Sequence, residues 1–166
     1  MGALPAFAQA PIQVVAAESS YGSMVQTIGG WHVRVTSVLD NSGINPRAFA
    51  ANPRIGSALL QAKLVVMNGL GFDSWMTKLL DGTPSPGRKV IVASEAESAM
   101  ILPDRNRHLF NSPDIMLATA RQVEQALIQI DPGNRNSYQA PPDPTRSRSA
   151  PRRCRVSPRP AKSPPY

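Results

Sequence analysis

The sequence predicts an α/β fold: a single lobe with a four-stranded parallel sheet flanked by helices, followed by a long helix and a disordered tail. Three observations lead to this prediction. Runs rich in β-branched residues alternate with segments of helical apolar periodicity, which is typical of strands joined by crossover helices. The connections are short, so successive strands should run parallel. One long amphipathic segment then follows the last strand.

The first strand and helix are predicted from an apolar run and the polar residues that end it. Ile12 to Ala17 should form a strand, and Ser19 or Ser20 should cap a helix over Tyr21 to Ile28. The Gly-Gly pair that follows should end this helix.

Two further strands are predicted on either side of a helix. Val33 to Leu39 alternates in character and is rich in β-branched residues, and Lys63 to Asn68 is a short apolar run typical of a strand buried on both faces. Pro53 fits the first turn of the helix between them, where no amide donor is needed. Asp73 or Ser74 should cap the helix after the third strand.

The last strand and the long helix complete the predicted lobe. Arg88 to Ala93 should be the fourth strand, and Pro113 should open the long helix. The apolar side of that helix should consist of Ile115, Leu117, Ala118, Val123, Leu127 and Ile130. The predicted organisation is a signal-peptide remnant at 1–10, an N-terminal α/β lobe at 11–112, a long connecting helix at 113–131 and a disordered Pro/Arg-rich tail at 141–166.

The positive charge is concentrated at the end of the chain. The formal net charge is +7, but residues 1–140 hold 11 basic and 10 acidic side chains, whereas residues 141–166 hold 7 basic and 1 acidic. The charge therefore does not indicate a basic face on the lobe. Cys154 is the only cysteine, so no intrachain disulfide is expected.

The N-terminal residues allow two interpretations. Residues 1–10 are small and apolar and include Ala6-Phe7-Ala8, a pattern typical of a signal-peptidase site. They are either the end of a secretory signal, which would place the protein in the periplasm or at the cell surface, or a disordered Ala-rich terminus. No segment approaches the roughly 20 apolar residues of a membrane span, so no span is expected.

The tail also allows two interpretations. Among its 26 residues, 8 are proline and 7 are basic, so it cannot bury enough apolar surface to fold. It could be an out-of-frame translation of a GC-rich gene. Alternatively, the protein is a small basic interaction protein whose Arg-rich tail binds nucleic acid or anionic surfaces. Specific nucleic-acid recognition is not expected, because Tyr166 is the only aromatic residue of the tail.

Several segments carry a resemblance to a known family. They are Val14 to Glu18, Tyr21-Gly22, Ile28 to Gly30, Val33 to Leu39, Asn68 to Met76, Arg107 to Phe110, and Asp131 to Asn134 with Tyr138. In this order they resemble the metal-binding solute-binding proteins of zinc and manganese ABC transporters, with Arg107 to Phe110 at that family's Pro-His-Leu-Trp motif. The resemblance implies two α/β lobes joined by a long helix, of which this chain matches the N-terminal lobe and the helix.

The resemblance also implies a metal site. Family members hold zinc or manganese with two histidines of the first lobe and two groups of the second. His108 matches the second histidine. The first histidine belongs to an Asp-Pro-His sequence, where this chain reads Asn45-Pro46-Arg47. Arg47 thus marks a lost ligand position, because a guanidinium has no lone pair to offer. Metal binding is therefore expected to be impaired.

Further site residues are expected where the predicted strands end. Glu18, Ser19 and Asn68 should line the cleft, since ligands of open α/β sheets bind at the carboxyl ends of the strands. His32 matches no ligand position and is expected to be exposed. The protein is not expected to be an enzyme, because no Ser-His-acid or Cys-His pattern is visible.

Two partners are expected. The resemblance implies an ABC-transporter membrane permease. In addition, without a second lobe the apolar side of the long helix from Val123 to Ile130 should be exposed, so self-association through this helix is expected.

Overall fold

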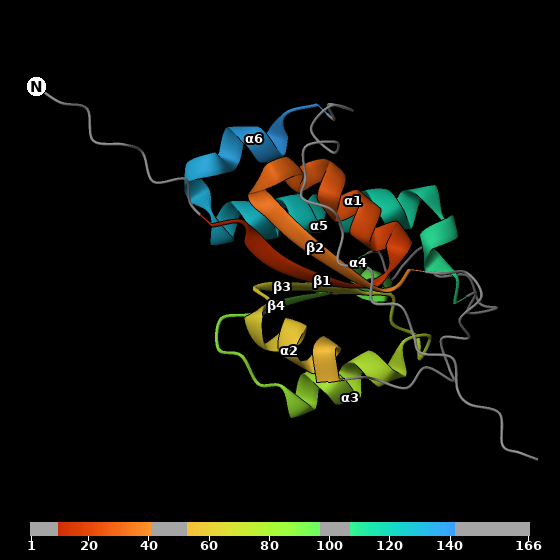
Figure 1. Cartoon of the computed structure of the whole chain (residues 1–166). Helices are drawn as coiled ribbons and strands as arrows, with labels where there is room; N and C mark the ends of the chain where they lie inside the picture. The colour runs from red at the N-terminus through yellow and green to blue at the C-terminus, as the bar shows by residue number, and fades with distance from the viewer. Residues whose placement is uncertain (1–9, 41–52, 97–106, 142–166) are drawn as a thin grey trace, which may run out of the picture.

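A computed structural model describes residues 10–40, 53–96 and 107–141, and it contains a four-stranded sheet between two layers of helices (Figure 1). The strands are β1 (Ile12–Glu18), β2 (Val33–Leu39), β3 (Leu64–Met67) and β4 (Lys89–Val92). The helices are α1 (Ser19–Gly29), α2 (Pro53–Gln61), α3 (Ser74–Gly82), α4 (Ala93–Ala96), α5 (Pro113–Ile130) and α6 (Arg135–Gln139). Short 3-10 helices span Gly30–His32, Leu109–Asn111 and Pro132–Asn134. The predicted fold class is confirmed.

The order of the strands determines where a ligand could bind. All pairs are parallel and the order is β2-β1-β3-β4, so β1 lies between β2 and β3. The chain leaves β1 toward one edge of the sheet and returns on its other side as β3. The carboxyl ends of β1 and β3 are therefore neighbours at the point where the order reverses, which is the usual ligand position in open α/β sheets.

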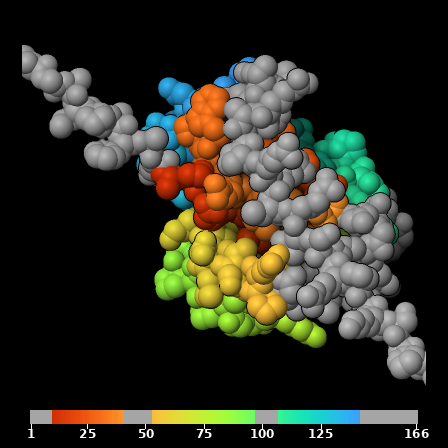
Figure 2. All heavy atoms as spheres, in the orientation of Figure 1, coloured from red at the N-terminus to blue at the C-terminus, as the bar shows by residue number. Residues whose placement is uncertain are grey.

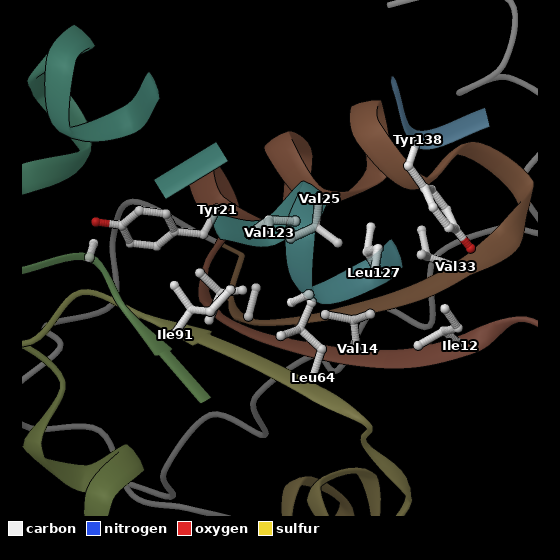
Figure 3. Packing of buried hydrophobic residues seen from close by; sticks show 14 of the residues in the cluster. Ile12, Val14, Tyr21, Val25, Val33, Leu64, Ile91, Val123, Leu127 and Tyr138 are labelled. Atoms are coloured by element: carbon white, nitrogen blue, oxygen red, sulfur yellow. The ribbon is translucent and has the colours of Figure 1, made fainter. Parts of the chain in front are cut away.

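The core has two parts, one on each face of the sheet. Val14 and Leu64 face α1 and α5, as Figure 3 shows, whereas Val15 and Val65 face α2 and α3. This follows from the alternation of side chains along a strand. In the space-filling view, α2 and α3, in yellow and green, form one side of the molecule, and α6, in blue, lies on the other (Figure 2). The central strands β1 and β3 are thus largely buried on both faces, as the continuous apolar run of the third strand predicts. The outer strands β2 and β4 are partly exposed.

The long helix α5 buries the predicted residues Ile115, Val123 and Leu127, but the lobe alone covers them. Val123 and Leu127 are 0% exposed, and Ala126 and Ile128 are also buried, so the expected exposure from Val123 to Ile130 was wrong. The lobe's own sheet and α1 cover this face (Figure 3). Self-association was predicted from exposure of this apolar surface, so the reason for that prediction is removed. Leu117, expected on the apolar side, is 54% exposed, because two residues along a helix lead to its opposite side.

Replacing Leu127 with alanine should therefore destabilise the lobe strongly. Removal of a fully buried leucine side chain costs about 2–5 kcal/mol, and Leu127 is 0% exposed in the larger core cluster. Leu117→Ala on the same helix is the matched control, and an exposed site should change stability by at most about 0.5 kcal/mol. Urea unfolding measures both. Equal losses for the two variants would contradict the observed orientation of α5.

Two local predictions are also corrected. No side-chain hydrogen bond from Ser19 or Ser20 caps α1, whose N-cap position is held by Glu18. His32, expected to be exposed, is half-buried, with its ring 5.5 Å from that of Trp31 and 5.7 Å from that of Tyr138. The reason is that α6 folds back and brings Tyr138 against the residues before β2. No helix in the described ranges is both long enough and apolar enough to cross a membrane.

Candidate functional site

Polar side chains gather where β1 and β3 end, at the reversal point of the strand order. Glu18 is the last residue of β1, and Asn68 follows the last residue of β3. Asp73 and Tyr21 come from the starts of α3 and α1. Since the strands are parallel, these residues share one edge of the sheet. Glu18 and Asn68 lie at this carboxyl edge, but at 6% and 0% exposure they are beneath the surface, so their lining of a cleft stays a prediction. Ser19 is half-buried.

Asn68 connects four parts of this edge. Its Oδ1 accepts a hydrogen bond from the Tyr21 hydroxyl at 2.9 Å, and its Nδ2 donates to the Arg107 carbonyl at 2.8 Å and to the Gly69 carbonyl at 3.1 Å. The Asn68 carbonyl accepts from the Ser94 amide at 3.1 Å. The ends of β3 and β4, the start of α1 and the segment before His108 are thus joined through one buried residue.

Asp73 fixes the loop between β3 and α3. It stands at the N-cap position of α3, but its carboxylate makes no cap bond. It accepts instead from the amides of Asn68, at 2.6 Å, and Gly69, at 2.9 Å. The loop can turn back because Gly69, Leu70 and Gly71 have φ values of +86°, +53° and +70°, a region that glycine enters at little cost and leucine does not. Asp73 thus holds the loop in a conformation that includes one strained residue.

Glu18 is a buried carboxyl group with no hydrogen bond to either side-chain oxygen among the described residues. Burial, and secondly the nearby charge of Asp73, raise its pKa from the ordinary 4.5 to about 9. Burial also raises the pKa of Asp73, although the hydrogen bonds from the backbone amides of Asn68 and Gly69 act in the opposite direction. An unpaired carboxylate is costly to bury, so Glu18 is neutral at pH 7.

His108 lies at the surface beside this polar cluster. It directly precedes the short helix Leu109–Asn111, and its side chain is exposed. Its ring is 5.3 Å from that of Phe72 and 5.7 Å from that of Phe110, in edge-to-face arrangements. Phe110 is in turn 6.4 Å from the ring of Tyr21. These aromatic neighbours hold an exposed imidazole beside the carboxyl edge of the sheet.

The structure leaves several predicted residues untested. Arg47, the signal remnant at 1–9 and the tail from 142 onward lie outside the described residues. Within the described ranges, no group of three or more His, Cys, Asp or Glu side chains could hold a metal ion. Of the two ligand positions that the resemblance implies for this lobe, His108 lies within the described residues, beside this edge.

Sequence reasoning missed three residues of the site. Tyr21 was expected only as part of a helix, Asp73 only as a cap, and Phe72 was given no role. For Asp73 a signal existed: the acidic residue follows a Gly-Leu-Gly turn, and a short acidic side chain there can bond the amides of the turn. The contact of Tyr21 with Asn68 crosses 47 residues and has no local signature.

Comparison with known proteins gives a consistent result. Residues 14–146 match the family model of the periplasmic zinc-uptake complex component A, ZnuA. A presumed metal-binding protein of Thermotoga maritima is 26% identical over 111 residues, which are 61% of this chain and 39% of that protein.

Solved structures show the same fold. A ZnuA deletion mutant with zinc bound is 26% identical at a TM-score of 0.67, with 78% of this chain and 50% of that chain covered. A manganese-bound periplasmic metal-binding protein from Candidatus Liberibacter asiaticus is 20% identical at a TM-score of 0.65, with 81% and 50% covered. This chain thus spans about half the length of these structures, and less of the curated relative.

Proposed function

Because the chain belongs to the family of periplasmic zinc-uptake component A proteins, we propose that it captures a zinc or manganese ion as cargo for an ABC-transporter permease, in the periplasm or at the cell surface. The match over residues 14–146 includes the whole described lobe except its first residues. The tail, on which the alternative of a basic interaction protein depends, lies outside the family match apart from its first residues.

The ligand that this lobe contributes is His108. The observation that carries this assignment is an exposed imidazole held by two aromatic rings next to the reversal point of the strand order. A neutral imidazole is a good ligand for zinc and also binds manganese. The carboxyl groups of Glu18 and Asp73 are both buried, at 6% and 1% exposure, so they act as supports rather than as ligands.

Binding by this chain is weak. A guanidinium about 4 Å from a dication would be repelled by roughly 8 kcal/mol at an effective dielectric constant near 20, so Arg47 at a ligand position opposes the ion. Structural zinc sites with four ligands bind the ion with a free energy of about 10–16 kcal/mol at pH 7. The whole sequence contains 2 histidines and 1 cysteine, so few strong ligands are available to reach that value.

Isothermal titration of zinc and manganese into the full 166-residue chain tests this function. We expect binding weaker than about 1 μM, that is, less than roughly 8 kcal/mol, and its loss in His108→Ala. His32→Gln is the matched control, because it removes the only other histidine and should leave binding unchanged. Submicromolar affinity would contradict the impairment, and binding indifferent to His108 would contradict the ligand assignment.

A further inference from the structure

We propose that Asn68 is a positioning residue for metal capture: it fixes the peptide group that precedes His108 and thereby sets the direction of the imidazole. The inference rests on the proposed role of His108 as a ligand. It concerns a buried residue that would not touch the ion, and it follows from the hydrogen bonds around Asn68.

The first step is that the Asn68 side chain is buried and that both its polar atoms are hydrogen-bonded. It is 0% exposed, its oxygen accepts from the Tyr21 hydroxyl at 2.9 Å, and its nitrogen donates to two carbonyls, that of Arg107 at 2.8 Å and that of Gly69 at 3.1 Å. Its backbone is also held, since its amide donates to Asp73 and its carbonyl accepts from Ser94. The Arg107 carbonyl is therefore bonded to a residue that is itself held through both its side chain and its backbone.

The second step is that this carbonyl belongs to the peptide bond between Arg107 and His108. His108 lies in no helix or strand, with φ −88° and ψ 59°, so no regular hydrogen-bond ladder fixes its backbone. The bond from Asn68 orients the peptide plane on the amino side of His108, and the bond from the Asn111 amide to the His108 carbonyl, at 3.0 Å, orients the plane on the other side. Together with the rings of Phe72 and Phe110, these contacts hold an exposed side chain at several points.

The third step is that this arrangement requires an amide side chain. A residue at this position must accept from Tyr21 and donate to Arg107 at the same time. Asparagine can do both, aspartate lacks the donor and leucine lacks both. Rigid support of a ligand raises affinity because less freedom is lost on binding. Partners of metal ligands typically change affinity by about 10- to 100-fold when they are removed.

Two variants separate positioning from simple stabilisation. Asn68→Leu keeps the approximate shape and removes the hydrogen bonds to Arg107, Gly69 and Tyr21. Tyr21→Phe removes only the last of these and keeps the bond to Arg107. Both variants leave buried polar groups unpaired and should lower stability. We expect Asn68→Leu to weaken zinc binding about 10-fold and to shift the His108 ring signals in NMR spectra of the metal-free chain. Tyr21→Phe keeps the bond to the Arg107 carbonyl, so it should change both readouts less than Asn68→Leu does.

The outcomes are distinct. Equal weakening by Asn68→Leu and Tyr21→Phe, or unchanged His108 signals in Asn68→Leu, would overturn the proposal. If zinc binding in the unaltered chain does not depend on His108, the proposed function fails, but the metal-free His108 signals still decide whether Asn68 positions the ring.

Should Asn68→Leu not fold, the unaltered chain provides the test. The side-chain amide signals of Asn68 should then shift as zinc is added, and their titration curve should match that of the His108 ring signals. The amide of Asn134 is the control, because its Nδ2 donates to Asp131 in the part of the molecule where Tyr138 lies, at the opposite end of the core from Tyr21 (Figure 3). Asn68 signals that do not respond while those of His108 shift would overturn the proposal.

Discussion

Arg47→His is expected to strengthen zinc binding by at least about 100-fold. At the position where the resemblance implies a ligand, the substitution would replace a positive charge with an imidazole. If the roughly 10–16 kcal/mol of a four-ligand zinc site is shared equally, one ligand contributes about 3 kcal/mol, which corresponds to a factor of about 100 in the dissociation constant. Competition with a zinc-sensitive dye measures the change.

Arg47→Ala is the control that separates the two effects, since it removes the charge without adding a ligand. It should gain less affinity than Arg47→His. The double variant Arg47→His with His108→Ala should not show the increase in zinc affinity expected for Arg47→His alone. Two ligands of one ion are coupled, so their effects are not additive. Equal affinities of Arg47→His and Arg47→Ala would show that position 47 does not reach the metal.

Glu18→Gln is expected to make the lobe more stable at neutral and alkaline pH and to flatten its pH dependence. The pKa of Glu18 is about 9 in the folded chain against an ordinary 4.5. Between these values the unfolded chain loses the proton and the folded chain keeps it, so the free energy of unfolding falls as pH rises. One pKa unit corresponds to about 1.4 kcal/mol, so the loss reaches roughly 3 kcal/mol at pH 7.

Urea unfolding at pH 4.5, 7 and 9 tests this prediction. The Glu18→Gln variant should lose less stability than the unaltered chain as pH rises, because the neutral glutamine has no proton to lose. The two proteins should differ least at pH 4.5 and most at pH 9. Asp81→Asn is the control, because Asp81 is an exposed carboxylate on α3. Parallel curves for the unaltered chain and Glu18→Gln would contradict the buried, neutral state of Glu18.

The parts of the fold that the sequence predicts well are those with a strong local pattern. The bounds of β2 are as predicted, because its alternating β-branched residues end at a polar turn. Pro113 opens α5 as predicted, because proline is preferred in the first turn. The prediction that Leu117 is buried was wrong. An apolar residue at the edge of a helical stripe can face the core or the solvent, and the position of the sheet determines which.

The candidate site is less predictable because its contacts join distant segments. The sequence places Glu18 and Asn68 at the carboxyl ends of strands, and they lie there; that they line a cleft stays a prediction. The hydrogen bond from Asn68 to Arg107 joins residues that are 39 positions apart in the sequence. A local sequence pattern cannot predict such a contact. His32 was misplaced for the same reason, because its neighbour Tyr138 comes from the other end of the described chain.

The most direct test of metal capture at His108 is an NMR titration of the full chain with zinc, observed at the histidine rings. The sequence has 2 histidines, so two sets of ring signals are expected, and His32 serves as an internal control from a different part of the molecule. We predict that the signals of His108 shift progressively with zinc while those of His32 stay in place. Unchanged His108 signals at millimolar zinc, or equal shifts of both histidines, would contradict the assignment of His108 as the ligand of this lobe.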